Sequence, residues 1–173
     1  MSNKLKITDV KWWATSPAGT PLVVVKILTD DPEIFGLGCA TFSWRYTAVI
    51  TLLEDYLRPF LIGKDPANIT DIWNSMNVNA YWRNGPVMNN AISGIDMALW
   101  DIKGKVAGMP CYDLWGGKSR VGATIYVHAD GKSKEELLDR LEQYREKGFT
   151  HIRCQLGGYQ GLLDGNEIPG GVN

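Results

Sequence analysis

Two short stretches of the sequence, YVHADG and THIRCQLGG, hold the side chains best suited to chemistry. Polar and apolar residues alternate in both, which is the pattern of a β-strand with two different faces. His128 falls on the polar face of the first stretch, and Arg153 and Gln155 fall on the polar face of the second. Such side chains can hydrogen-bond a ligand, and an imidazole can also move a proton near neutral pH. They are the first candidates for a functional site.

A helix is expected between these two strands. The segment SKEELLDRLEQYREKGF begins with Ser133 as an N-cap, and Glu136 follows three residues later, which is the pattern of a capping box. Strand, helix and strand in this order predict a βαβ unit with parallel strands and a right-handed crossover. We expect the helix to cover the apolar strand face through four residues, Leu137, Leu138, Leu141 and Tyr144. On the first strand that face comprises Ile125, Val127 and Ala129, and on the second Ile152, Cys154 and Leu156.

The polar face of this unit has two interpretations. Enzymes built on α/β barrels place their sites at the carboxyl ends of parallel strands, where His128 and Arg153 would point inward. In an open sheet with one solvated face, the same two residues would be ordinary surface residues. A closed barrel needs roughly 250 residues, and only two barrel strands can be identified here. The residues after Tyr159 are rich in glycine, lack periodicity and are expected to form a loop.

The residues before this unit read as a separate α+β domain. Three strands are expected at 6–15, 21–30 and 36–43, followed by helices at 47–63, 68–82 and 90–107. Pro59 should disturb or end the first helix, Asn68 should cap the second, and Gly108 should end the third. The third helix has an apolar face made of Ile92, Ile95, Leu99 and Ile102. The turn-rich segment CYDLWGGKSR suggests a boundary that divides the chain into domains 1–118 and 119–173.

Composition narrows the class of protein. The 173 residues are 45% hydrophobic, with 18 basic against 19 acidic residues and no basic run. These features favour a folded protein that binds neither nucleic acid nor a membrane. The N-terminus has no signal-peptide pattern, and the three cysteines form no CxxC pair, so we expect a cytoplasmic protein with reduced thiols. With only two histidines, a histidine-rich metal site within this chain is excluded.

Longer segments resemble a known family. The run RNGPVMNNAISGIDMALWDIKGKVAGMPCYDLWGG resembles the segment that closes the N-terminal capping domain in the enolase superfamily. Together with WWATSPAGTPLVVVKI, LRPFLIGKDP, YVHADG and FTHIRCQLGG, it is similar to the mannonate dehydratase group of the mandelate racemase/muconate lactonizing type, in its starvation-sensing-protein branch. The resemblance implies a capping domain, with a three-stranded antiparallel sheet plus helices. The start of a modified (β/α) TIM-type barrel would follow it.

The resemblance also implies an activity and residue roles. The family dehydrates sugar acids, here a mannonate- or gluconate-like aldonate, with Mg²⁺. On the matching positions, Arg153 and Tyr159 would form the catalytic acid/base pair, and His128, Ser43 and Trp13 would contact the substrate. The family's metal ligands lie on later barrel strands, so none is expected within this chain. The resemblance further suggests a homo-oligomer.

Two departures from the family pattern leave the activity open. In mannonate-active members the tyrosine lies twelve residues beyond the arginine; here Gly165 holds that place, and Tyr159 lies six residues on. Ser43 stands where those members carry an asparagine. The protein could be a dehydratase of low or narrowed activity, or a non-catalytic member that binds or senses a sugar acid. A third hypothesis, a free-standing interaction module, would leave strand edges unpaired.

Overall fold

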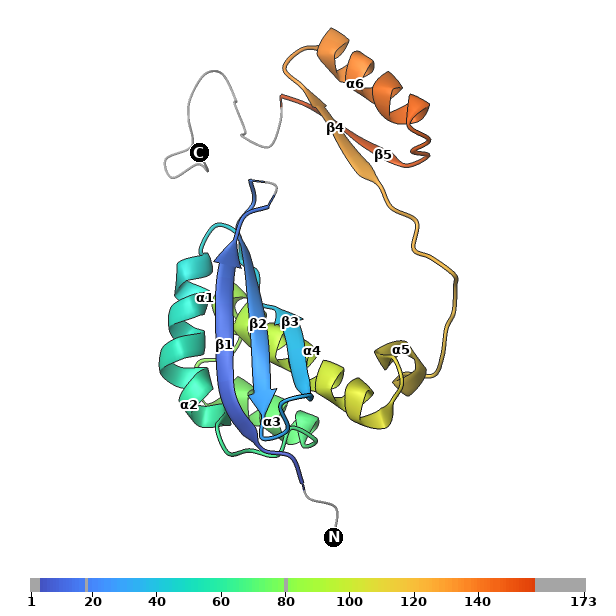
Figure 1. Ribbon diagram of the computed structural model, residues 1–173. Coiled ribbons are helices and arrows are strands. Elements are labelled where there is room, and N and C mark those ends of the chain that lie inside the picture. The colour runs from blue at the N-terminus through green and yellow to red at the C-terminus, as the bar shows by residue number, and fades with distance from the viewer. Residues whose placement is uncertain (1–3, 18, 80, 158–173) are drawn as a thin grey trace. The chain divides into compact units, whose positions relative to one another are not determined.

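The computed structural model describes residues 4–17, 19–79 and 81–157. The chain divides into two compact units, Met1–Lys118 and Ser119–Asn173, and each is described by itself below (Figure 1). Within the described ranges, no helix combines the length and the apolar character needed to cross a membrane.

The first unit contains a three-stranded antiparallel sheet with the strand order β1-β2-β3. The strands are β1 (Ile7–Thr15), β2 (Leu22–Thr29) and β3 (Phe35–Cys39). Alternate residues of β2 are buried, beginning with Val23 and Val25, as expected for a strand with one covered face. This confirms the three strands and the antiparallel sheet expected from the sequence.

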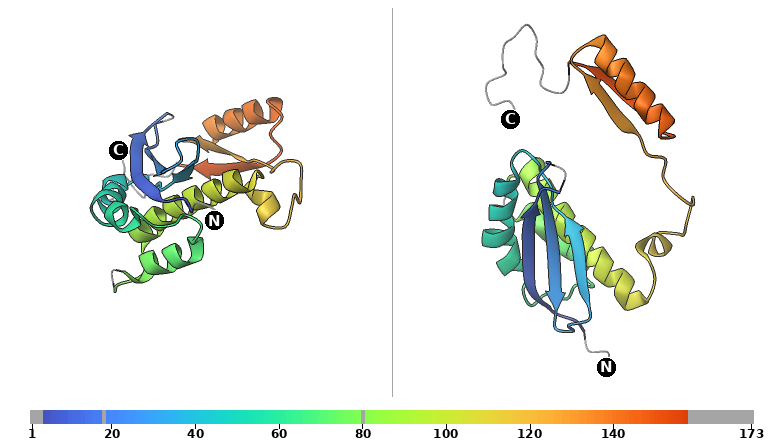
Figure 2. Two further views of the ribbon diagram at one scale, coloured as in Figure 1. Left: turned by 60° about the horizontal axis from the view of Figure 1, so that its bottom comes forward. Right: turned by 45° about the horizontal axis from the view of Figure 1, so that its top comes forward.

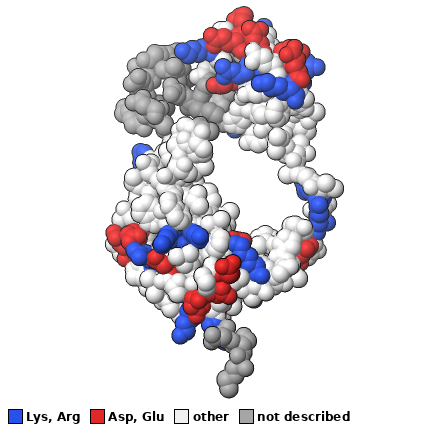
Figure 3. Space-filling view, in the orientation of Figure 1, with Lys and Arg blue, Asp and Glu red and all other residues white. Residues whose placement is uncertain are grey.

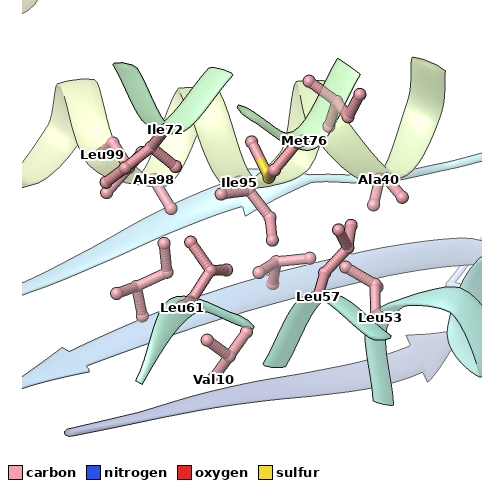
Figure 4. Close-up of a cluster of buried hydrophobic side chains, with 14 of the residues drawn as sticks. Val10, Ala40, Leu53, Leu57, Leu61, Ile72, Met76, Ile95, Ala98 and Leu99 are labelled. Carbon is pink, nitrogen blue, oxygen red and sulfur yellow. The ribbon is translucent and has the colours of Figure 1, made fainter. Parts of the chain in front are cut away.

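Apart from the short helix α5, which lies past the end of α4, the helices of this unit lie on one face of the sheet, as both views in Figure 2 show. Their bounds are α1 (Tyr46–Leu52), the π-helix η1 (Leu53–Leu57), α2 (Arg58–Leu61), α3 (Ile69–Val78), α4 (Pro86–Ala107) and α5 (Cys111–Leu114). Between sheet and helices lies a single apolar core. Figure 4 shows Leu53, Leu57 and Leu61, spaced by four residues, facing Val10 on one side and the α4 residue Ile95 on the other.

Two helix boundaries differ from the sequence-based expectation, because α3 ends at Val78 instead of Trp82 and α4 begins before Asn90. The disturbance expected at Pro59 is confirmed: the helical segment continues past it, but the five residues before Arg58 take the wider π-helical form, and α2 has proline in its first turn. Because proline has no N–H to donate, the preceding turn must change its hydrogen bonding. The start expected at Asn90 was wrong, because α4 begins at Pro86, whose fixed φ suits a first helical position. Its end at Gly108, in the left-handed conformation, is confirmed.

Charged residues of α4 have a structural task. The strand β3 is an edge strand, and the outward backbone groups of an edge would otherwise lack partners. The N–H of Leu37 donates to Asp101 Oδ2 at 2.8 Å, and Lys105 Nζ donates to the Phe35 carbonyl oxygen at 2.6 Å. Lys105 and Asp101 also form an ion pair at 2.9 Å. These side chains therefore protect the sheet edge.

A pH-dependent stability follows from Asp96 on the same helix. Burial raises the pKa of this carboxyl above its ordinary value of 3.8. The folded state then binds a proton more readily than the unfolded chain, so the free energy of unfolding falls as the pH rises from the ordinary pKa through the raised one. We expect Asp96→Asn to raise the melting temperature at pH 7 and to leave it unchanged at about pH 3, where both states are protonated. Asp55, exposed on η1, provides the control Asp55→Asn, and an equal gain at both pH values would contradict the prediction.

The second unit is a βαβ arrangement of β4 (Val127–Gly131), α6 (Lys134–Glu146) and β5 (Ile152–Leu156). The two strands are parallel, as the order of elements predicted. Ser133 caps α6, its hydroxyl accepting from the Glu136 N–H at 3.2 Å. The Glu136 side chain reaches the Lys132 N–H at 2.9 Å instead of that of Ser133. The predicted N-cap is therefore confirmed, with a shifted second bond.

The packing of this unit differs from the expectation in three places. β4 is shorter than expected: it begins at Val127, so Ile125 and Tyr126 precede the strand. These two side chains are 65% and 59% exposed. Leu138 is exposed, whereas Leu137, Leu141 and Tyr144 are half-buried, so the covered stripe of α6 follows the three- and four-residue spacing without Leu138. Cys154 and Leu156 are exposed although α6 contacts β5, because one helix does not cover the whole face of two strands. The outer side of α6 carries acidic and basic side chains next to one another (Figure 3).

Candidate functional site

The parallel pairing of β4 and β5 places the predicted polar residues on one face. His128 is the register partner of Arg153, and Asp130 is the register partner of Gln155. Register partners on adjacent strands project to the same side of a sheet. His128 and Gln155 are half-buried and Arg153 is exposed. The structure thus brings an imidazole, a guanidinium and an amide together at neighbouring positions, a set that can bind the oxygens of an anionic ligand.

An aromatic ring adjoins this set. The ring of Tyr126 lies 5.2 Å from that of His128 between centroids, with an angle of 32° between their planes. The sequence alternation put Tyr126 on the same face as His128, but sequence reasoning gave it no role. The signal that could have found it is the spacing of two residues between two aromatic rings in the segment expected to form a strand.

Asp130 is held by the helix of its own unit. Its carboxylate forms an ion pair with Arg140 of α6, and both side chains are about half exposed. Mg²⁺ prefers several oxygen ligands, usually with carboxylates among them. Among the residues that the structure describes, no three His, Cys, Asp or Glu side chains gather in a way that could hold a metal ion. The described part of this chain therefore does not itself form a magnesium site.

Trp13 and Ser43 belong to the first unit. Trp13 pairs with Val24, which in turn pairs with Cys39. The side chains of these three residues face away from the helices, and Trp13 is 49% exposed. Ser43 is half-buried in the segment that follows β3. Two hydrogen bonds fix the start of that segment, from the Val23 N–H to Thr41 Oγ1 at 3.0 Å and from the Ala40 N–H to the Val23 carbonyl at 2.9 Å. The segment leaves the sheet at the end where β1 passes into β2 (Figure 1), so Trp13 and Ser43 lie at one end of the sheet.

Tyr159, the predicted acid/base partner of Arg153, lies outside the described residues, as does Gly165. The structure therefore brings together His128 with Arg153 in the second unit, and places Trp13 and Ser43 at one sheet end in the first.

Sequence reasoning missed a polar network beside Trp12. Arg58 bonds Asp9 at 2.8 Å and Glu54 at 2.6 Å, and Glu54 also accepts from the Trp12 indole N–H at 3.1 Å. The two carboxylates raise the pKa of Arg58, first through its hydrogen bond to Asp9. These residues line a shallow hollow of about 330 Å³. The network connects β1 with η1 and α2. Trp12 takes part in it and the neighbouring Trp13 faces the other way, as expected for adjacent residues of a strand.

Comparisons with known proteins agree with this architecture. Residues 3–116 match the family described as mandelate racemase/muconate lactonizing enzyme, N-terminal domain. A D-galactonate dehydratase family member from Pantoea ananatis is 60% identical over 161 residues, which cover 93% of this chain and 38% of the relative. One from Enterocloster bolteae is 55% identical over 163 residues, which cover 94% of this chain and 40% of the relative. This chain thus spans about two fifths of the length of these relatives.

A solved structure is similar over the described fold. The crystal structure of an enolase from Pantoea ananatis with bound D-gluconate and magnesium has a TM-score of 0.85 and 59% sequence identity, covering 91% of this chain and 38% of that one. The three-stranded sheet with helices on one face corresponds to the capping domain of that superfamily. On the match over residues 3–116, the chain belongs to the mandelate racemase/muconate lactonizing enzyme family of the enolase superfamily.

Proposed function

We propose that this chain is the N-terminal part of a sugar-acid dehydratase that requires Mg²⁺ and acts on an aldonate such as D-gluconate or D-mannonate. One observation carries the proposal. His128 and Arg153 stand side by side on parallel strands, in a chain 59% identical to an enolase whose crystal structure contains D-gluconate and magnesium. Residues 1–118 would form the capping domain and residues 119–173 would begin a (β/α) barrel.

The chemistry required is the removal of water from neighbouring carbons. A base takes the proton from the carbon α to the carboxylate, and the hydroxyl on the β carbon leaves with a proton as water. The resulting enol becomes a 2-keto-3-deoxy acid. The base must act on a weakly acidic C–H bond, so the negative charge that develops on the carboxylate side needs electrostatic stabilisation. When bound, Mg²⁺ supplies positive charge for that purpose.

The residues of this chain would hold the substrate and move protons. Arg153 carries a permanent positive charge, because a guanidinium stays protonated at physiological pH. A phenol titrates near ~10, and a nearby cation favours the phenolate. Arg153 would thus make Tyr159 the base of an acid/base pair, while His128 would hydrogen-bond the substrate. Trp13 and Ser43 would contact the substrate from the capping domain. The metal ligands would come from residues other than those described here.

A second candidate function is binding of a sugar acid without turnover. It is favoured by the position of Tyr159, six residues beyond Arg153 instead of twelve, and by Ser43 in place of an asparagine. A loop of different length would have to bring the phenol to the same point. Either change could narrow the activity or abolish it. For both functions we also propose a homo-oligomer, on the family resemblance alone, and a cytoplasmic location, on the cysteine spacing and the N-terminal pattern.

The two functions are separated by a screen of aldonates with the complete protein. We expect formation of a 2-keto-3-deoxy acid from at least one aldonate in the presence of Mg²⁺, and none when the metal is chelated. A Mg²⁺-dependent rise in melting temperature without product would instead support the binding function. The absence of both product and stabilisation across the whole panel would contradict both functions.

A further inference from the structure

The geometry around His128 points to a role for Tyr126. Tyr126 directly precedes β4, which begins at Val127, and lies two residues before His128, so the two rings can meet on one side of the chain. Their centroid distance of 5.2 Å and interplanar angle of 32° describe a tilted stack. Aromatic rings at such distances attract one another, most favourably when they are offset or tilted.

We propose that Tyr126 is a positioning residue that fixes the orientation of the His128 imidazole in the substrate site. The inference rests on the proposed function, in which His128 contacts the sugar acid. The terminal χ2 torsion of histidine has broad, two-fold preferences, so the backbone of β4 alone does not fix the direction of the two ring nitrogens. A second ring lying against the imidazole narrows that choice. Hydrogen bonding to a substrate then begins from an ordered ring, which lowers the cost of binding.

The direction of the strands places Tyr126 on the side of His128 that faces away from the expected ligand site. Ligand sites of parallel α/β folds lie at the carboxyl ends of the strands. Tyr126 precedes β4 and lies two residues to the amino side of His128, so its ring supports the imidazole from the side opposite the carboxyl end. Arg153, on the neighbouring strand, lies beside His128 in register. Tyr126 thus acts through His128, and its hydroxyl group is not required for the stack.

The chain offers matched variants for a test. Tyr126→Ala removes the ring, whereas Tyr126→Phe keeps it and removes only the hydroxyl. Ile125→Ala is the control, because Ile125 is the preceding residue and, at 65% exposure, is as open to solvent as Tyr126 at 59%. A thermal melt of each variant verifies that it folds.

The first readout is steady-state kinetics of the complete protein with D-gluconate, or with the aldonate on which it proves most active, and Mg²⁺. We expect Tyr126→Ala to raise KM at least about fivefold with a smaller change in kcat, as for loss of an interaction that holds the substrate in both ground and transition states. Tyr126→Phe and Ile125→Ala should stay within about twofold of the wild type. A lower melting temperature with unchanged KM would show a merely structural role and overturn the proposal.

The second readout does not depend on activity. Ring-proton NMR signals of His128, assigned by their disappearance in His128→Gln, report the ring that lies against it. We expect these signals to move in Tyr126→Ala and to stay in place in Tyr126→Phe and in Ile125→Ala. Unmoved His128 signals in Tyr126→Ala would overturn the positioning role. If they move but no aldonate is bound or converted by the wild type, the proposed function fails and the ring contact stands.

Discussion

Gly38→Ala is expected to destabilise the first unit by at least about 3 kcal/mol, at the upper end of the range for overpacking a core. A Cβ atom at position 38 would lie 1.9 Å from the carbonyl oxygen of Gly94. The obstructing atoms, in the Gly94 carbonyl group and the Ala98 N–H group, belong to the backbone, so no side-chain rotation can relieve the clash. At Gly36 the same distance, 1.9 Å, separates a Cβ from the Ala98 carbonyl oxygen. The strand β3 and the helix α4 approach so closely that only glycine fits at these two positions.

The matched control for this variant is Gly122→Ala. No atom lies within 4 Å of a Cβ added at Gly122, so alanine there tests the general effect of a methyl group. Thermal or urea unfolding, followed by circular dichroism, measures both variants. A free energy of unfolding for Gly38→Ala within about 1 kcal/mol of the control would show that α4 does not lie as close to β3 as described.

Tyr159→Phe is expected to abolish dehydration, lowering kcat by about 10²- to 10⁴-fold, the usual contribution of one acid or base. The substitution removes only the phenol oxygen, so substrate binding should change little. Product formation at saturating aldonate and Mg²⁺ measures the effect. Tyr112→Phe is the control, because Tyr112 lies on α5 of the first unit and is 49% exposed. Turnover unchanged by Tyr159→Phe would remove this tyrosine from the mechanism.

The fold was predicted correctly where residues close in the sequence decide the local structure. The strand β2 and the cap at Ser133 depend on residues close in the chain, and both were predicted. The role of Asp101 and Lys105 could not be predicted, because their partners on β3 lie 64 and 70 residues away. The same holds for Gly36 and Gly38, whose need for close packing with α4 arises only once the strand and helix meet.

The candidate site was predictable to a similar depth. Strand alternation predicted that His128 and Arg153 share a face, and the register of β4 and β5 confirms it. The ion pair between Asp130 and Arg140 could not be predicted, since it depends on how α6 lies along β4. The roles of Tyr159, Ser43 and Trp13 stay predictions, because they require a substrate and residues other than those described.

The central claim is that this chain supplies only part of a site completed by further residues of one polypeptide. The mass of the intact protein purified from its native source tests it most directly. The 163 aligned residues make up 40% of the Enterocloster bolteae relative, which therefore has about 408 residues. The 173 residues of this chain weigh 19.2 kDa, so a chain of about 408 residues would weigh about 45 kDa. We expect a mass near that value. A mass of 19.2 kDa would contradict the account, because the described chain would then have to act without the rest of the site.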